Sequence, residues 1–302
     1  MTPRRILVTG AGGFVGGHLL PALYRAFPDA AIAGLVADVT DRAAVTTEIA
    51  DGRPDAVVHL AAISAVPAAR DDPGQAWTVN LGGTLNVARA ITAHAPACTL
   101  LFVSTADLYG ATFQGGAALT EDALLAPLNT YAATKAAADL ALGAMAAEGL
   151  RVIRARPFNH TGPGQSDAFV VPAFARQVAR IAAGLQPPVM HVGSLTPMRD
   201  FLDVRDVCAA YAACLAHDLP PGTVLNLASG VPRRVGDVLA ALMAEAGIDA
   251  EIRTEPTRLR PTDIASAIGD SRRAQRLLGW APMIPWAQTL HDVLEDWQAR
   301  VR

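Results

Sequence analysis

The sequence contains few cysteines and no closely spaced cysteine pair. Only three occur among its 302 residues, the widely spaced Cys98, Cys208 and Cys214. An odd number without a C-x-x-C motif argues against a disulfide framework and a cysteine-based zinc site, so the three thiols are expected to be small buried apolar residues in a reducing compartment. The histidines also lack a metal-ligand spacing with cysteines or carboxylates, and we predict no metal site.

An excess of positive charge and a long apolar run are missing as well. The net charge of -3 argues against a nucleic-acid surface, which needs clustered positive charge. The first apolar run ends after three residues at Thr9 and Gly10, so no secretory signal fits there. The most apolar stretch, residues 132–147, contains Lys135 and Asp139, which argues against a membrane span. We therefore expect a cytoplasmic protein that binds neither nucleic acid nor a membrane.

The first two-thirds of the chain alternates short apolar runs with longer helical stretches. Strands are expected at residues 6–8, 56–60, 100–103 and 151–155. Helices are expected at residues 13–26, 42–50, 75–94 and 130–148. This alternation indicates βαβ units, and the nearly continuous apolar character of the strands indicates burial on both faces. The sequence therefore predicts an α/β protein with a Rossmann-type, doubly wound parallel sheet.

After Pro157 the pattern becomes irregular and rich in proline. A helix at 204–217 and a strand at 224–227 look like one more unit of the sheet, and further helices are expected at 168–184, 235–246, 271–278 and 286–300. We assign residues 1–158 and 203–230 to the sheet domain. Residues 159–202 and 231–302 are assigned to a smaller, discontinuous cap. The two parts meet near residues 157–160, where a ligand cleft is expected.

A glycine motif follows the first predicted strand directly and opens the first helix. Gly10 allows a tight turn, Gly13 lets the backbone approach a pyrophosphate, and Gly16 lets the helix pack closely on the strand. The phosphates then lie at the positive end of the helix. In this strand–turn–helix context the motif predicts a dinucleotide site, so the sheet domain is a dinucleotide-binding domain.

Tyr131 and Lys135 lie one turn apart at the head of an apolar helix, so their side chains share a face. An ammonium beside a phenol lowers the phenol pKa from about 10 towards neutrality, which makes the phenol a usable proton donor or acceptor. The preceding strand ends at Thr105, where a hydroxyl can meet the same substrate oxygen. We therefore interpret Tyr131 and Lys135 as a catalytic pair.

Five motifs in the correct order carry a resemblance to a known family: the glycine loop, residues 58–62, residues 80–84, residues 104–110 and the Tyr131/Lys135 pair. Together they resemble the extended short-chain dehydrogenase/reductases, the NAD-dependent epimerase/dehydratase family, over nearly the whole chain. The resemblance implies an enzyme with NAD(H) or NADP(H) as cofactor and with Thr105, Tyr131 and Lys135 as its catalytic triad. The cofactor would be held by Gly10, Gly13, Phe14, Val15, Asp38, Val39, Leu60, Ala61, Ala62, Asn80, Tyr131, Lys135 and Pro157.

Motifs at residues 156–165, 192–203 and 259–263 narrow this resemblance. They are similar to the reductases that convert GDP-4-keto-6-deoxy-D-mannose to GDP-D-rhamnose. The implied partner is a nucleotide sugar, with a GDP-sugar favoured, and its implied binding residues are Ser64, Asp107, Asn159, Arg199 and Arg260.

Arginine suits a diphosphate because its planar fork donates charge-assisted hydrogen bonds. The sequence leaves another interpretation open for both arginines. Arg199 has possible ion-pair partners in Asp200 and Asp203, and Arg260 has one in Asp263.

Three other functions stay open. A nucleotide-sugar 4,6-dehydratase needs an additional acid or base, and dehydratases of this family have a glutamate two positions after the catalytic threonine. This chain has Asp107 there, preceded by Ala106. A 4-epimerase that recycles its cofactor is the second alternative. A non-catalytic, dinucleotide-sensing protein is the third, and the intact Thr105, Tyr131 and Lys135 disfavour it.

The sequence departs from the usual pattern in the segment after the second strand, which normally contacts the 2′-position of the cofactor ribose. The second and third strands look nearly fused within residues 30–41, and we place Asp38 and Val39 after the third strand, near the adenine. The loop that distinguishes NADH from NADPH is then missing. We expect weak discrimination, with Arg42 as the first candidate for contact with a 2′-phosphate.

The helix predicted at residues 130–148 is apolar nearly all round. A surface helix needs only one apolar stripe, so its outer face is expected to be covered. In the family this helix pairs with its copy in a second subunit, and the resemblance implies a homodimer.

Overall fold

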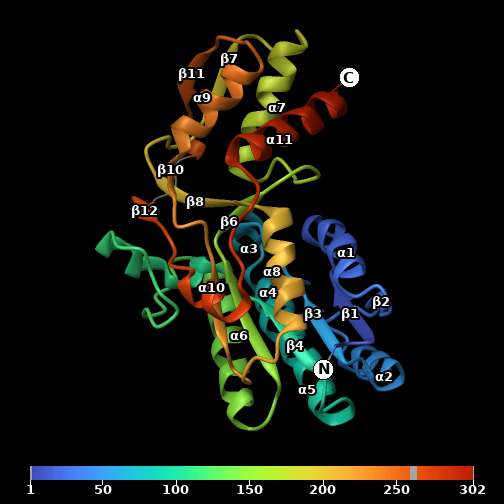
Figure 1. Cartoon of the computed structure of the whole chain (residues 1–302). Coiled ribbons are helices and arrows are strands. Elements are labelled where there is room, and N and C mark those ends of the chain that lie inside the picture. Colours follow the sequence, from blue (N-terminus) through green and yellow to red (C-terminus); the bar gives the residue numbers. More distant parts are fainter. Residues whose placement is uncertain (1, 259–263, 302) are drawn as a thin grey trace.

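The computed structural model describes residues 2–258 and 264–301. A sheet domain occupies the lower part of the molecule in Figure 1 and a smaller cap the upper part. None of the helices in the described ranges combines the length and the apolar character needed to cross a membrane.

Six parallel strands form the sheet of the lower domain. Their order is β2 (Ala31–Gly34), β1 (Arg5–Thr9), β3 (Ala56–His59), β4 (Thr99–Val103), β5 (Val152–Pro157) and β9 (Val224–Leu227). Strands β3, β4 and β5 are buried nearly throughout, as their continuous apolar sequences predict for a sheet covered on both faces. The predicted Rossmann-type fold is confirmed.

Helices cover both faces of this sheet (Figure 1). On one face α1 (Phe14–Ala26) and α8 (Val204–Ala216) enclose a core with the strands. On the other face lie α2 (Arg42–Gly52), α5 (Thr84–His94) and α6 (Thr130–Ala147). The carboxyl ends of the strands therefore open at one edge of a three-layered domain, towards the cap.

The cap has its own hydrophobic core. It combines α7 (Val170–Ala182), α9 (Val235–Glu245) and α11 (Trp286–Val301) with the parallel pair β7 (Val189–Val192) and β11 (Glu251–Thr254). A small sheet joins the cap to the lower domain and contains β6 (Asn159–Thr161), β8 (Met198–Asp203), β10 (Pro232–Arg234) and β12 (Ser266–Ala267).

The C-terminal boundary of the cap needs a correction. Helix α10 (Arg272–Leu278) was predicted inside the cap, but it lies against the lower domain in Figure 1. Ala274, Leu278 and Trp280 belong to the core that α1 and α8 share with the sheet, and the Trp280 indole donates a hydrogen bond to the Asp206 carbonyl at 2.9 Å. The chain therefore returns to the sheet domain once more before α11, because these apolar side chains are buried in the core of that domain.

Two local predictions were also wrong. Residues 35–41 contain no strand, so Asp38 and Val39 follow the second strand, β2, and precede the third, β3. The predicted helix 75–94 is divided into α4 (Pro73–Trp77), a π-helical segment (Thr78–Gly83) and α5, and it is preceded by the short α3 (Val66–Asp71). A π-turn adds a residue within an otherwise apolar helical pattern, and periodicity alone does not reveal it.

Candidate active site

The glycine loop between β1 and α1 forms a cradle that side chains would fill. Gly10 has φ +67°, and a Cβ on it would lie 2.9 Å from the backbone nitrogen of Ala61. A Cβ on Gly16 would lie 2.2 Å from the Ala11 carbonyl oxygen. Gly13 precedes α1, and no side chain caps the helix there. The first amides of α1 therefore face outward for an anionic ligand, which fits the pyrophosphate of a dinucleotide.

A cleft of about 810 Å³ runs from this loop between the sheet domain and the cap. It contains most of the residues predicted to bind the cofactor, namely Gly10, Gly13, Phe14, Val15, Leu60, Ala61, Ala62, Tyr131, Lys135 and Pro157. It also contains four of the predicted substrate residues, namely Ser64, Asp107, Asn159 and Arg199. Thr105 lies in the same cleft, so the predicted catalytic residues and ligand residues share one space.

The surroundings of Tyr131 in this cleft favour the protonated form of its phenol and raise its pKa. Burial raises its pKa above the ordinary 10, and the nearby charge of Asp107 raises it further. A hydrogen bond with the Thr105 side chain acts in the opposite direction but does not outweigh them. The predicted lowering of the Tyr131 pKa by Lys135 is therefore not found, because desolvation of the phenolate is the larger effect.

Lys135 is held against the sheet. Its Nζ donates a hydrogen bond of 2.5 Å to the Val103 carbonyl and lies 4.2 Å from the centre of the Phe102 ring. Burial lowers the pKa of this lysine from 10.5 to about 7, while the charge of Asp139 acts to raise it. The contacts with the Val103 carbonyl and the Phe102 ring thus orient the Lys135 ammonium where it lines the cleft.

Beneath the catalytic pair lies an ion cluster that sequence analysis missed. The fully buried Asp139 accepts hydrogen bonds from Arg156 Nη2 at 2.8 Å and from Arg154 Nη1 at 3.0 Å. Burial alone would raise the Asp139 pKa, but these two guanidinium groups outweigh it and lower the pKa. The only sequence signal was the spacing of Asp139, one helical turn after Lys135 on α6.

Three predicted cofactor residues are not among those that line the cleft. Asn80 is fully buried, and its amide accepts from the Ile63 nitrogen at 2.8 Å and donates to Thr134 Oγ1 at 2.9 Å, so it supports the wall of the cleft. Asp38 lies on the exposed loop after β2, where its carboxylate accepts hydrogen bonds from Thr40. Val39 is buried behind that loop.

Arg199 extends from β8 into the cleft. Its Nη1 donates to the carbonyl oxygens of Met198 at 2.9 Å and Ile264 at 2.6 Å. Asp200 accepts hydrogen bonds from Ser229 and Gly230. Asp203 is paired with Arg205 at 2.7 Å. The two acids proposed as alternative partners of Arg199 are thus engaged elsewhere. Arg260 and Asp263 lie outside the described residues.

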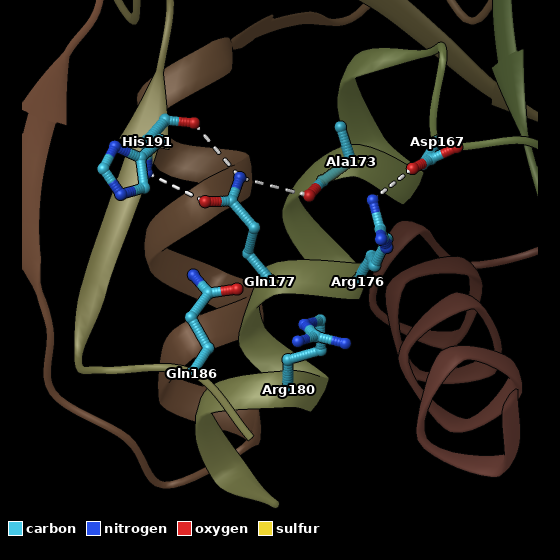
Figure 2. Close-up of a pocket in the computed structure, with 7 residues that line it drawn as sticks. All are labelled: Asp167, Ala173, Arg176, Gln177, Arg180, Gln186 and His191. Atoms are coloured by element: carbon cyan, nitrogen blue, oxygen red, sulfur yellow. Dashed lines mark hydrogen bonds and ion pairs between the residues drawn. The ribbon is translucent and has the colours of Figure 1, made fainter. Parts of the chain in front are cut away.

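A second, smaller hollow of about 360 Å³ lies in the cap beside α7 (Figure 2). Gln177 links α7 to β7 there, because its amide accepts from the His191 nitrogen at 2.8 Å and donates to the His191 carbonyl at 3.1 Å. Arg176 is paired with Asp167 at 2.6 Å. These contacts link α7 to neighbouring segments of the cap.

Within the described ranges, no group of three or more histidine, cysteine or acidic side chains is arranged to hold a metal ion.

Comparisons with known proteins agree with this geometry. The chain matches the family model described as GDP-mannose 4,6 dehydratase over residues 25–293. It is 38% identical, over 99% of both chains, to GDP-6-deoxy-D-mannose reductase from Pseudomonas aeruginosa. It is 28% identical, over 91% of both chains, to GDP-6-deoxy-D-talose 4-dehydrogenase from Aggregatibacter actinomycetemcomitans.

Solved structures give the same assignment. RMD from Pseudomonas aeruginosa complexed with NADPH superimposes with a TM-score of 0.91, at 36% identity and over 98% of this chain and 99% of the other. UDP-glucose 4-epimerase from Thermus thermophilus in complex with NAD gives a TM-score of 0.86, at 26% identity and over 97% and 99% of the two chains. The chain therefore belongs to the extended short-chain dehydrogenase/reductases, the NAD-dependent epimerase/dehydratase family, and is an enzyme that acts on nucleotide sugars.

Proposed function

We propose that the enzyme reduces the 4-keto group of a nucleotide-linked 6-deoxyhexose, and that its substrate is GDP-4-keto-6-deoxy-D-mannose, which gives GDP-D-rhamnose. The observation that carries this proposal is the cleft in which Thr105, Tyr131 and Lys135 lie together with the glycine loop, the Thr105 side chain being hydrogen-bonded to Tyr131. A protonated phenol is ready to donate to a developing alkoxide, as a reduction requires. The similarity to GDP-6-deoxy-D-mannose reductase supports the choice of sugar and base.

In this mechanism a bound NADH or NADPH supplies the hydride that adds to the carbonyl carbon. Tyr131 donates its phenolic proton to the carbonyl oxygen, which becomes a hydroxyl, and the phenolate then recovers a proton from solvent. Thr105 orients the same oxygen, since its hydroxyl lies within hydrogen-bond reach of Tyr131. Lys135 lines the same cleft, where its ammonium would hold the ribose of a bound cofactor and would favour the transient phenolate.

The substrate residues are assigned from the family resemblance, and Ser64, Asp107, Asn159 and Arg199 also line the cleft. Arg199 and Arg260 would bind the diphosphate, where a planar guanidinium can donate two parallel hydrogen bonds. Asn159, Ser64 and Asp107 would contact the sugar, because they line the same cleft as Tyr131.

The test is to incubate the protein with GDP-4-keto-6-deoxy-mannose and NADH or NADPH and to identify the product. We expect stoichiometric oxidation of the nicotinamide and a GDP-6-deoxyhexose with a 4-hydroxyl group. Failure to consume the reduced cofactor would contradict the proposal and would favour a non-catalytic, dinucleotide-sensing role.

A 4,6-dehydratase is the second candidate, because the matching family model carries that name. Elimination requires a group that removes the C5 proton and one that assists loss of the C6 hydroxyl. Ala106 is buried and apolar, and Asp107 is one methylene shorter than the glutamate of the dehydratases. Steady formation of an alkali-absorbing 4-keto product from GDP-mannose with catalytic NAD or NADP would favour the dehydratase. Inversion at C4 of the nucleotide sugar without net redox change would instead indicate an epimerase.

A further inference from the structure

The segment that follows β2 lies directly beside the glycine loop. A Cβ on Gly34, the last residue of β2, would approach the Cβ of Ala11 to 3.0 Å. The Leu35 nitrogen donates to the Val8 carbonyl at 2.9 Å, so the chain turns across the end of β1. In a doubly wound fold the residues after the second strand face the adenosine ribose of the cofactor. By this rule residues 35–38, which are not among those that line the cleft, would face the 2′-position of a bound cofactor.

Two successive backbone amides of this loop already bind an anionic group of the protein. Glu48 extends from α2, and its carboxylate accepts from the Val36 nitrogen and from the Ala37 nitrogen, each at 2.9 Å. Paired amides of this kind form a site that binds phosphate oxygens in other proteins. Here the Glu48 carboxylate accepts from both amides, so they are not free to bind a phosphate oxygen.

The charged residues around this loop would also disfavour a 2′-phosphate. Residues 35–48 contain three acids, Asp38, Asp41 and Glu48, and one base, Arg42. Hydrogen bonds from the Thr40 nitrogen and hydroxyl lower the pKa of Asp38, so it remains charged at neutral pH. Asp41 caps α2 by accepting from the Ala43 and Ala44 nitrogens. A 2′-phosphate placed here meets a net negative field.

We propose that Glu48 is a cofactor-specificity residue and that it makes this enzyme bind NADH more tightly than NADPH. The proposal deepens the proposed function at the cofactor and rests on it only for the presence of a dinucleotide site. One carboxylate near a doubly charged phosphate at an exposed position corresponds to a preference of about 10-fold. This preference lies within the weak discrimination expected from the sequence, but its direction is set by the loop.

The test measures binding and not turnover. NADH and NADPH are titrated separately into the purified full-length protein, and the fluorescence of the reduced nicotinamide gives each dissociation constant. We expect the wild type to bind NADH about 10-fold more tightly. Glu48→Ala should tighten NADPH by roughly 5-fold or more and leave NADH within about 2-fold, because the two amides and the local charge are both released. Glu48→Gln, which keeps the shape of the side chain, should give a smaller shift in the same direction.

Asp51→Asn is the matched control, because it removes an exposed carboxylate from the same helix close to its C-terminal end. Its ratio of dissociation constants should equal that of the wild type. A wild-type preference for NADPH, or an unchanged ratio in both Glu48 variants, would overturn the proposal. Since the titrations contain no sugar nucleotide, their outcome is independent of whether the proposed reduction is correct.

Discussion

The phenol of Tyr131 and the ammonium of Lys135 respond to burial in opposite ways. Loss of water raises the pKa of the phenol and lowers the pKa of the lysine to about 7, because the charged form of each is disfavoured. Both side chains are thereby shifted towards their neutral forms. Asp139, with Arg154 and Arg156 around it, is the charge that keeps Lys135 from losing its proton more readily.

We predict that Tyr131→Phe lowers turnover by at least about 10²-fold, since the variant has no proton to donate to the alkoxide. Cofactor affinity, measured by fluorescence titration, should stay nearly unchanged because the ring is kept. Turnover close to that of the wild type would exclude Tyr131 as the proton donor.

Arg199→Ala should raise KM for the sugar nucleotide by roughly 10-fold or more, and should change KM for the nicotinamide far less. Arg199→Lys retains the charge without the planar fork and should recover only part of the loss. Steady-state kinetics with each substrate varied in turn provides the comparison. If both KM values rise in parallel, Arg199 is structural and its hydrogen bonds to Met198 and Ile264 are its main contribution.

At the scale of single elements, the close packing of α1 on the glycine loop determines whether the cofactor cradle keeps its shape. Gly16 and Gly17 are adjacent in α1, but a Cβ on Gly16 would meet the Ala11 carbonyl, whereas one on Gly17 has no atom within 4 Å. The two positions therefore separate packing from helix propensity.

We expect Gly16→Ala to weaken cofactor binding by roughly 10-fold or more and to lower the melting temperature, because the loop backbone must move to accept the methyl group. Gly17→Ala should leave cofactor binding unchanged and stabilise the protein by about 0.5–1 kcal/mol, as alanine is favoured over glycine within a helix. Thermal unfolding and cofactor titration of both variants test this. Equal effects of the two substitutions would contradict the assigned packing role of Gly16.

At the scale of the whole molecule, the outer face of α6 remains apolar and accessible. Leu140 is 59% exposed, and Ala133, Ala137 and Ala144 lie on the same helical stripe with partial or full exposure. We propose that this stripe packs against its copy in a second subunit, as the family resemblance implies.

Leu140→Glu should therefore convert a dimer into a monomer, because each dimer would bury two carboxylates in an apolar contact. The mass in solution, measured by light scattering after gel filtration, gives the result. Leu185→Glu is the control, since Leu185 is 51% exposed but lies in the cap, away from α6. A wild-type monomer, or a dimer that survives Leu140→Glu, would contradict the proposed interface.

Local sequence patterns determined most of the helices and strands, and they also indicated which residues lie together in the cleft. The apolar runs of β1, β3, β4 and β5 and the glycine loop were predicted with small errors at their ends, because burial on both faces and close backbone approach demand particular residue types. The positions of Thr105, Tyr131 and Lys135 in one cleft also followed from motif order, since parallel strands end at the same edge of a sheet.

Tertiary structure decided what depends on contacts between distant residues. The pKa of Tyr131 rises because the assembled cleft removes water, which no spacing of residues reveals. Asp139 on α6 is paired with Arg154 and Arg156 on β5. These residues are distant in sequence, and they meet only because α6 packs on β5. Two other features also depend on contacts between elements. Helix α10 packs into the core of the sheet domain, and Glu48 accepts a hydrogen bond from the loop after β2. Composition and periodicity give no information about such contacts.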